Sequence, residues 1–219
     1  MTDLQDLRTR VCALHTELTR WDLVAWTSGN VSARVPGTDR MVIKASGVSY
    51  DDLVPEHMVE CDLHGRPVHD SGHSPSSDTA AHAYVYRALP GIGGVVHTHS
   101  PYATAWAARG EPIPCAVTAM ADEFGGDIPV GPFSRIGDDS IGRGIVATLE
   151  HHRSPAVLMA HHGVFTVGAT AKDAVKAAVM CEDVARTLHL ARQNGPLERL
   201  PQEDIDALHD RYRNVYGQK

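Results

Sequence analysis

The sequence lacks the features that mark membrane, disulfide-rich and nucleic-acid-binding proteins. No apolar stretch among its 219 residues approaches the ~20 residues that a membrane-spanning helix needs. The four cysteines are widely spaced and form no CxxC pair, so we expect free thiols rather than a disulfide framework. The net charge is −7 and the basic residues are scattered, which argues against a nucleic-acid partner.

The composition and the first residues are those of an ordinary globular protein. Hydrophobic residues make up 42% of the sequence and charged residues 21%, which excludes intrinsic disorder. The first six residues are acidic and show no basic segment followed by an apolar one, so we expect a cytoplasmic protein without a signal peptide. The length suits one domain with its own core, and we expect a single domain over residues 1–219.

Hydrophobic periodicity predicts helices interspersed with short strands. The first twenty residues should form an amphipathic helix, because apolar residues recur there at spacings of three and four: Leu4, Leu7, Val11, Leu14 and Leu18. We expect further helices over residues 79–89, 101–109, 140–151, 170–194 and 201–212. Strands are expected over residues 31–34, 41–44, 59–62, 94–99, 156–160 and 164–167. This order predicts an α/β fold with a central, mainly antiparallel sheet.

Histidine is abundant and unevenly placed. Two of the close pairs among the 14 histidines, His97/His99 and His161/His162, lie within apolar runs. Residues i and i+2 of a strand point to the same face about 7 Å apart, so His97 and His99 can aim at one metal ion. A hydrogen-bonded pair of core histidines is an equally good interpretation of this motif alone. However, two buried rings in an otherwise apolar strand would need several polar partners, which favours the metal.

A third ligand is expected where the strand over residues 156–160 ends. Only one of His161 and His162 can face the same side, and Gly163 permits a close backbone approach, which favours His162. Three histidines with an open coordination position are typical of a catalytic metal site, and without cysteine ligands a structural zinc is the weaker alternative. Asp78 is the candidate carboxylate, although the helix dipole alone explains an acid at a helix start.

Three short segments could bind a phosphate group. Residues 75–78, Pro-Ser-Ser-Asp, lead into a helix whose free backbone N–H groups favour an anion; Ser76 or Ser77 is the expected N-cap. Residues 27–30, Thr-Ser-Gly-Asn, form a glycine-containing turn, and residues 44–47, Lys-Ala-Ser-Gly, add a cation and a hydroxyl. Each segment alone is ordinary turn or cap chemistry. Beside a metal site, the three together indicate a phosphorylated polyol or sugar.

These motifs resemble the class II aldolase/epimerase family of sugar-phosphate enzymes, of the aldolase class II/adducin type. The resemblance is carried by residues 27–32, 75–78, 97–100 and 161–163 and covers the chain from about residue 5 onward. Within the family, the chain is most similar to pentulose-phosphate 4-epimerases in residues 43–48, 76–79, 93–100, 121–122 and 216–218. The resemblance implies a three-layer α/β/α domain in a homotetramer, with the active sites between subunits.

The resemblance also implies a role for each matching residue. The metal ligands would be Asp78, His97, His99 and His162, holding one Zn²⁺ per subunit, with Mn²⁺ or another divalent ion as the alternative. The contacts to a small phosphorylated sugar would be Gly29, Asn30, Lys44, Ser46, Gly47, Ser76 and Ser77. The two acid/base residues would be Asp122, in a glycine-rich loop, and Tyr216, contributed by a neighbouring subunit.

The implied reaction inverts carbon 4 of a ketopentose phosphate by retro-aldol cleavage and re-addition, within carbohydrate catabolism. An aldolase that releases both fragments would share the metal and phosphate sites. Asp78, Asp122 and the Tyr-Gly-Gln ending argue against it. A dehydratase or decarboxylase of the same fold and a non-catalytic scaffold domain are further alternatives. Residues 135–155 and the tail are shorter than in longer bacterial epimerases, so neither His209 nor Arg211 aligns with the tail histidine found there.

Overall fold

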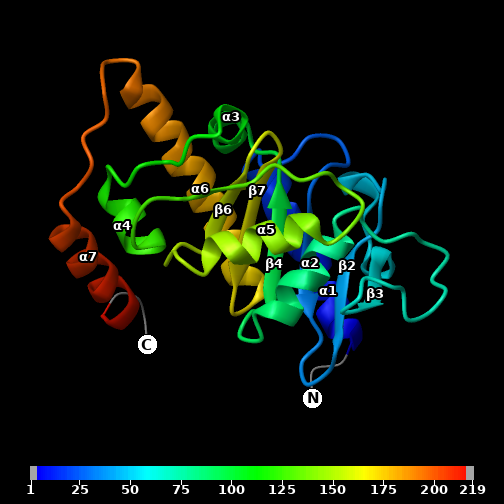
Figure 1. The fold of residues 1–219 in the computed structure, drawn as a ribbon. Coiled ribbons are helices and arrows are strands. Elements are labelled where there is room, and N and C mark those ends of the chain that lie inside the picture. Colours follow the sequence, from blue (N-terminus) through cyan, green and yellow to red (C-terminus); the bar gives the residue numbers. More distant parts are fainter. Residues whose placement is uncertain (1–3, 216–219) are drawn as a thin grey trace.

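Seven strands form one sheet in the computed structural model, which describes residues 4–215 (Figure 1). The strand order is β3-β2-β1-β4-β7-β6-β5. Only β5 and β6 pair in parallel among these neighbours, so the sheet is mixed and mainly antiparallel, as expected. The strands are β1 Asn30–Arg34, β2 Arg40–Lys44, β3 Met58–Asp62, β4 Gly94–Thr98, β5 Val130–Gly131, β6 Ala156–Met159 and β7 Gly163–Gly168.

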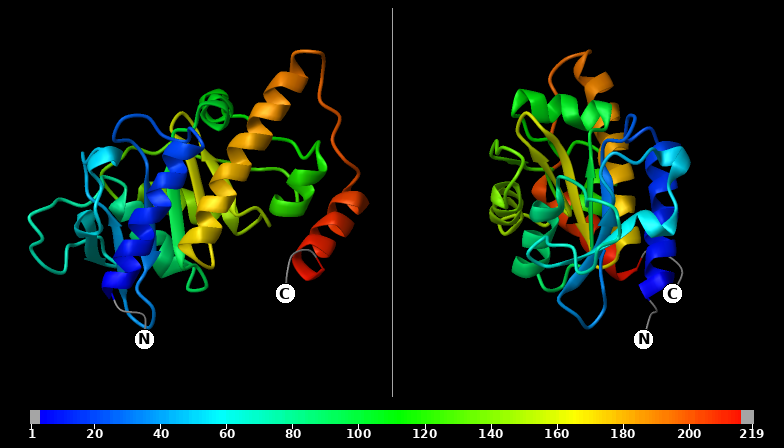
Figure 2. Two further views of the ribbon diagram at one scale, coloured as in Figure 1. Left: turned by 180° about the vertical axis from the view of Figure 1, so that it is seen from behind. Right: turned by 90° about the vertical axis from the view of Figure 1, so that its right-hand side faces the viewer.

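Helices cover both faces of the sheet, which confirms the three-layer α/β/α arrangement (Figure 2). α2 and α5 pack on one face, and α1 and the first half of α6 pack on the other. The end of α6 packs with α3, α4 and α7 in a third cluster beside β6 and β7. The helices are α1 Leu4–Arg20, α2 Thr79–Ala88, α3 Pro101–Arg109, α4 Thr118–Phe124, α5 Ser140–Leu149, α6 Ala171–Arg192 and α7 Gln202–Asn214.

The two helical layers explain why most strand residues are buried and apolar. Every residue of β4 and β6 is buried, and so are the first four residues of β1. In an antiparallel sheet with one solvent-exposed face, polar and apolar residues alternate along each strand. In a sheet covered on both faces, the strands contain continuous apolar runs. Polar side chains inside these strands are therefore exceptions that need partners. Among the described helices, none is both long enough and apolar enough to cross a membrane.

The structure differs from the expectations in several places. The helix at residue 79 is preceded by Asp78 as N-cap, not by Ser76 or Ser77, which lie in the turn before it. β4 ends at Thr98, so His99 lies just beyond the strand. Residues 118–124 form α4 rather than a loop, and the two-residue strand β5 was not expected. Both elements are short, and the N-cap position of α4 is Val117, which offers no capping side chain.

A buried carboxylate fixes the segment that follows His99. The backbone N–H groups of Tyr102 and Ala103 donate to the two oxygens of Glu182, each at 2.9 Å. These groups belong to the first turn of α3, where N–H groups have no partner within the helix. Because Glu182 lies on α6, this contact ties the start of α3 to the helical layer that covers β4. The position of His99 is thereby restrained from both sides.

The packing of β4 against α6 depends on a residue without a side chain. A Cβ atom on Gly94 would lie 2.3 Å from Cα and 2.4 Å from N of Ala171. We expect Gly94→Ala to lower the free energy of unfolding by about 1–3 kcal/mol, because it overpacks this contact. Urea denaturation measures the loss. Gly91→Ala is the matched control, since nothing lies within 4 Å of its Cβ position. An equal loss in both variants would refute this explanation.

Candidate active site

The residues expected to bind the metal and the substrate line one cavity of about 270 Å³. It lies at the edge of the sheet where β1 begins and β4 ends. Thr27, Ser28, Ala45 and Ile136 complete its lining. The predicted site residues that it brings together are Gly29, Asn30, Lys44, Ser46, Gly47, Ser76, Ser77, Asp78, His97, His99 and His162. Their roles remain predictions, but their common location is a property of the structure.

Strand pairing brings the histidines together from distant parts of the sequence. His97 lies in β4 and His99 follows it, while His162 lies in the tight turn between β6 and β7. Because β4 pairs with β7, with Thr98 opposite Val164, this turn lies beside the end of β4. The potential ligand atoms of the three histidines all lie within 4.8 Å of one another. The cluster is therefore positioned to bind a metal ion.

The hydrogen bond of His97 to Val164 directs the lone pair of Nε2 into the cluster. Its Nδ1 lies 2.9 Å from the carbonyl oxygen of Val164, and because a carbonyl only accepts, Nδ1 must carry the proton. In the neutral ring, Nε2 is then unprotonated, and it lies 2.9 Å from Nε2 of His99. A backbone carbonyl that fixes the tautomer of a histidine in this way is typical of metal-binding sites.

The turn at Gly163 selects His162 rather than His161. A Cβ on Gly163 would lie 2.6 Å from the carbonyl oxygen of Thr98 and 2.9 Å from Cδ2 of His99. Glycine therefore lets the turn approach β4 closely enough for His162 to join the cluster. His161 has a φ of 58° and is exposed, and its ring faces Phe133 at a centroid distance of 6.2 Å.

Burial keeps the clustered imidazoles neutral at physiological pH. Burial lowers the pKa of His97 to about 3, although the Asp78 carboxylate partly opposes this shift. Burial also lowers the pKa of His99 and of His162. Metal ions bind the neutral imidazole, so the ligands need lose no proton at neutral pH.

Asp78 faces the same cavity with one oxygen occupied and one open. Oδ2 accepts from Nδ2 of Asn30 at 2.9 Å and from Oγ of Ser76 at 3.4 Å. Oδ1 is buried and has no hydrogen-bond partner among the described residues. Burial alone would raise the pKa of Asp78, but His97, His82 and the Asn30 hydrogen bond hold it below its usual value. An ionised carboxylate with an open, buried oxygen is a suitable metal ligand.

The ammonium group of Lys44 is buried beside the cavity. Lys44 is only 1% exposed, and its Nζ lies 3.4 Å from the carbonyl oxygen of Thr27 and 3.3 Å from that of Ala45. Burial lowers its pKa, with no carboxylate of the described residues counteracting the shift. A buried cation without an anionic partner is costly, so an anionic group entering the cavity would gain from it.

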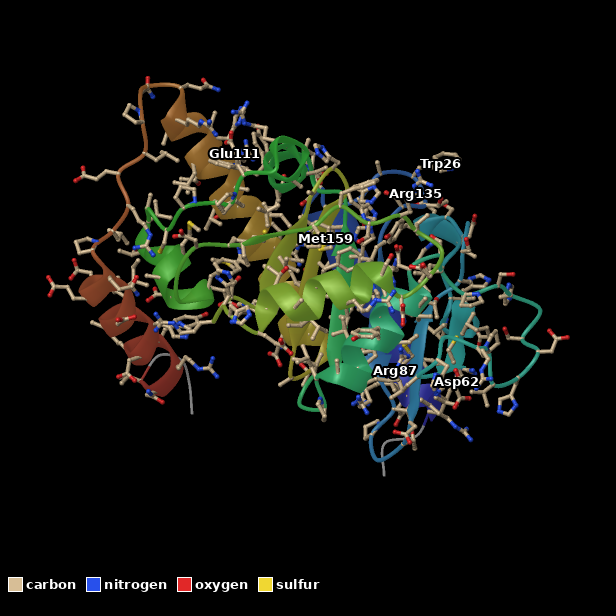
Figure 3. The ribbon with its side chains drawn as sticks, in the orientation of Figure 1. Trp26, Asp62, Arg87, Glu111, Arg135 and Met159 are labelled. Atoms are coloured by element: carbon tan, nitrogen blue, oxygen red, sulfur yellow. The ribbon has the colours of Figure 1, made fainter. Side chains whose placement is uncertain are left out.

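Tyr50 supports this region and had no signal in the sequence, whereas Trp26 lies near it without lining the cavity. Tyr50 donates its hydroxyl to the carbonyl oxygens of Ser28 at 2.8 Å and Gly29 at 3.2 Å, which holds the turn in place. Trp26 precedes this turn and is 89% exposed, at the periphery of the molecule (Figure 3). An isolated tyrosine or tryptophan in sequence gives no indication of either position.

Of the two predicted acid/base residues, Asp122 is not in this cavity, and Tyr216 cannot be placed because it is not among the described residues. Asp122 lies on α4 and does not line it. α4 packs against α7, where Nδ1 of His209 lies 3.0 Å from the carbonyl oxygen of Asp122, and Figures 1 and 2 show these helices together at one end of the molecule. Arg211 is exposed on α7. Tyr216 lies outside the described residues, one position after Val215.

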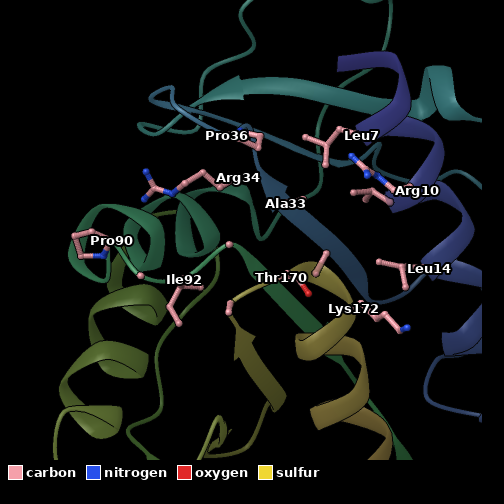
Figure 4. A pocket seen from close by; sticks show the side chains of 15 residues that line it. Leu7, Arg10, Leu14, Ala33, Arg34, Pro36, Pro90, Ile92, Thr170 and Lys172 are labelled. Carbon is pink, nitrogen blue, oxygen red and sulfur yellow. The ribbon is translucent and has the colours of Figure 1, made fainter. Parts of the chain in front are cut away.

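A larger cavity of about 450 Å³ lies at the opposite end of β4 and contains none of the predicted site residues (Figure 4). Leu7, Pro90 and Ile92 contribute apolar surface to it, and Arg34 and Lys172 contribute charge. Its lining within residues 4–215 includes no clustered metal ligands and no hydroxyl-rich turns. The smaller cavity is therefore the candidate active site.

Comparison with known proteins identifies the family. The model of the class II aldolase and adducin N-terminal domain matches residues 9–189. L-ribulose-5-phosphate 4-epimerases UlaF of Salmonella paratyphi C (strain RKS4594) and Salmonella choleraesuis (strain SC-B67) are 40% identical over 204 residues, with 88% of both chains covered. The chain belongs to the class II aldolase family.

Solved structures agree with this assignment. An L-fuculose 1-phosphate aldolase superimposes with a TM-score of 0.88 at 25% identity, covering 95% of this chain and 96% of its own. The L-fuculose-1-phosphate aldolase of Thermus thermophilus has a TM-score of 0.72 at 25% identity, covering 88% and 98%. The fold thus occurs in relatives named for two different reactions.

The adjacent histidines provide a matched test of the metal cluster. We expect His162→Asn to weaken zinc binding at least tenfold, because it removes one of three clustered imidazoles. His161→Asn should leave zinc binding unchanged, since this side chain is exposed and asparagine tolerates a positive φ. Competition with a chelator of known zinc affinity measures both. Equal weakening in the two variants would contradict the assigned cluster.

Proposed function

We propose that the chain is a metal-dependent 4-epimerase that interconverts L-ribulose 5-phosphate and D-xylulose 5-phosphate. The observation that carries this proposal is the joint placement of three clustered imidazoles and a buried ammonium group around one cavity. A metal site next to an anion site suits a sugar phosphate. The 40% identity to relatives named L-ribulose-5-phosphate 4-epimerase supports this particular substrate.

The residues present fit a divalent metal. His97, His99 and His162 would hold it, and Asp78, which lines the same cavity but is not part of this cluster, would be the fourth ligand. Nitrogen ligands with one carboxylate suit zinc, and we propose Zn²⁺ as the working ion. When bound, such an ion supplies Lewis-acid stabilisation of the negative charge that develops on substrate oxygens.

The reaction requires a route that avoids simple deprotonation. Carbon 4 of a 2-ketopentose phosphate is not adjacent to the carbonyl, so its hydrogen is not acidic. A base can instead remove the proton from the hydroxyl on carbon 4, so that this carbon becomes an aldehyde as the bond to carbon 3 breaks. The bond electrons pass to the enediolate of dihydroxyacetone. Rotation of glycolaldehyde phosphate and re-addition then invert carbon 4, and an acid returns the proton.

The phosphate contacts retain the aldehyde fragment during this rotation. Lys44 supplies a buried positive charge, and Ser46, Ser76 and Ser77 supply hydroxyl groups around the same cavity. A fragment held by its phosphate can turn its carbonyl without leaving, which separates epimerisation from net cleavage. Retention of the aldehyde fragment is therefore the role of Lys44, Ser46, Ser76 and Ser77.

Two acid/base groups are needed on opposite faces of carbon 4, one for each configuration of its hydroxyl. The resemblance assigns them to Asp122 and Tyr216. Asp122 is remote from the cavity of its own chain, on α4, and α4 packs against α7. We therefore propose a homotetramer in which α4 and the segment after α7 serve the cavity of a neighbouring subunit.

The products of L-ribulose 5-phosphate test the proposed reaction. With the zinc-loaded protein we expect D-xylulose 5-phosphate to form without accumulation of free dihydroxyacetone. Asp122→Asn and Tyr216→Phe should each lower kcat by roughly 10²–10⁴-fold, because general acid–base groups contribute rate factors of this size. Product analysis by coupled enzyme assay and NMR measures both compounds together.

The alternative is an aldolase that releases both fragments, and the TM-score of 0.88 to an L-fuculose 1-phosphate aldolase favours it specifically. Stoichiometric release of free dihydroxyacetone from L-ribulose 5-phosphate, or cleavage of L-fuculose 1-phosphate to dihydroxyacetone phosphate, would replace the epimerase by this aldolase.

Mixed tetramers test whether the site is shared between subunits. His97→Asn inactivates the cavity of a subunit, and Tyr216→Phe inactivates its tail. When subunits of both variants assemble in equal amounts, about a quarter of the sites should combine an intact cavity with an intact neighbouring tail. Activity should therefore rise well above that of either variant alone. If cavity and tail act within one subunit, mixing will restore no activity.

A further inference from the structure

Tyr50 lies next to the predicted phosphate contacts without lining the cavity itself. It begins the short 3₁₀ helix η1, Tyr50–Asp52, and its side chain is half-buried. Its hydroxyl oxygen lies 2.8 Å from the carbonyl oxygen of Ser28 and 3.2 Å from that of Gly29. Carbonyl oxygens only accept, so both share the single hydroxyl proton. Burial raises the pKa of Tyr50, which keeps this proton in place at physiological pH.

The shorter of these bonds orients the peptide group that joins Ser28 to Gly29. In a trans peptide the carbonyl and the N–H point in opposite directions, and no peptide bond among the described residues is cis. Because the Ser28 carbonyl accepts from Tyr50, the N–H of Gly29 points away from Tyr50. Gly29 lines the cavity. A carbonyl oxygen carries partial negative charge, so a carbonyl that turned into the cavity would repel a bound anion.

The turn that carries these carbonyls has little room to rearrange. Gly29 has a φ of 77°, and a Cβ there would lie 2.6 Å from Cγ1 of Val24 and 2.9 Å from the carbonyl oxygen of His97. The N–H of Ser28 donates to the carbonyl oxygen of Ala25 at 3.0 Å, which closes the turn on its other side. The carbonyls that accept from the hydroxyl therefore belong to a closely packed segment of backbone.

The ring of Tyr50 also faces the ammonium group of Lys44. Nζ lies 5.3 Å from the ring centre, and it donates to the carbonyl oxygens of Thr27 at 3.4 Å and Ala45 at 3.3 Å. A buried ammonium group above an aromatic ring gains a cation–π attraction. None of these three partners carries a net charge. The positive charge of Lys44, which lines the cavity, is therefore held in place without being neutralised.

His15 of α1 is a further fixed neighbour of the Tyr50 ring. The two ring centres are 6.1 Å apart. Nδ1–H of His15 donates to the carbonyl oxygen of Val11 at 2.8 Å, and Nε2 accepts from the N–H of Val31 at 3.0 Å. Burial lowers the pKa of His15 to about 3, so this ring is neutral and adds no charge near Lys44.

We propose that Tyr50 is a positioning residue for the phosphate group of the substrate, acting through the Ser28–Gly29 turn with its hydroxyl and through Lys44 with its ring. The inference rests on the proposed function, because that function makes a sugar phosphate the anion in the cavity. The hydroxyl keeps two carbonyl dipoles engaged, and the ring holds the ammonium group that attracts the anion. A phosphate held less firmly would let the aldehyde fragment leave before re-addition.

Inorganic phosphate tests this role without turnover. In the full-length, zinc-loaded protein we expect Tyr50→Phe to weaken phosphate binding about 3- to 10-fold, as the loss of one hydrogen bond does. Tyr50→Leu, which also removes the ring, should weaken it about 10- to 100-fold. NMR titration of the Gly29 amide resonance measures both affinities at the turn itself. Zinc affinity, measured by chelator competition, should stay within twofold of the unchanged protein in both variants.

Tyr84→Phe is the matched control. Tyr84 is also half-buried, and the guanidinium of Arg87 lies 5.3 Å from its ring centre, but Tyr84 does not line the cavity. This variant should bind phosphate as the unchanged protein does. With L-ribulose 5-phosphate, Tyr50→Phe should raise KM by the same factor as the phosphate Kd and release free dihydroxyacetone. Tyr84→Phe should do neither, which separates positioning of the phosphate from a general loss of packing.

Equal phosphate affinities in Tyr50→Phe and the unchanged protein would overturn the positioning role and leave the proposed reaction standing. Equal weakening in Tyr84→Phe would overturn it as well. If urea denaturation showed that the Tyr50 variants do not fold, the unchanged protein would decide: phosphate must shift the resonances of the Gly29 amide and Lys44 Nζ together, and absence of either shift would refute the inference. A protein that binds phosphate in this Tyr50-dependent way but does not convert L-ribulose 5-phosphate would overturn the proposed reaction alone.

Discussion

The pairing of β4 with β7 on one side and with β1 on the other is the constraint on which the candidate site depends. It places the turn carrying His162 beside the end of β4, and it places Asn30 directly opposite His97. Neither contact exists in an isolated hairpin, because β1 and β4 are separated in sequence by β2, β3 and α2. The site thus forms only when the centre of the sheet is complete, so its geometry is as rigid as the core.

The same architecture makes it costly in free energy to bury the polar side chains of the site. Both faces of the sheet are covered by helices, so the polar side chains of β1 and β4 lie in an apolar layer. Unpaired polar groups in such a layer cost several times what a paired hydrogen bond returns. The protein meets this cost by pairing most of them: His97 with Val164, Asn30 with Asp78, and Ser32 with His82 and Tyr86. Some groups stay unpaired among the described residues, including Oδ1 of Asn30, Oδ1 of Asp78 and Oγ1 of Thr98. Asp78 lines the cavity, and so does Lys44, whose ammonium has carbonyl partners but no carboxylate partner among the described residues.

Local sequence patterns predicted the helices and strands well, but they predicted the tertiary contacts between them only in part. The His-x-His spacing and Gly163 identified the cluster because strand geometry and a close backbone approach are local properties. α4 was not predicted, because it has only seven residues and its N-cap position carries no capping side chain. Asp122 could not be placed relative to the cavity, since its position depends on the packing of α4 against α7, which no local pattern encodes. The hydrogen bond between His82 and Ser32 was not predicted for the related reason that a single histidine in a helix does not reveal what lies across from it.

On the proposed function, separate roles for the cavity and for α4 with the segment after α7 would explain how one fold supports two reactions. Relatives named as epimerases and as aldolases share this architecture. On this proposal, cleavage of the carbon–carbon bond uses the three histidines and the proposed phosphate contacts, which all line one cavity of one chain. Whether the fragments recombine as the epimer depends instead on two further steps. The aldehyde must be retained, and its oxygen must be protonated from the second face when it adds back. On the proposed function, that second face belongs to α4 and the segment after α7. Changes in these elements would then redirect the outcome while the histidine cluster stays constant.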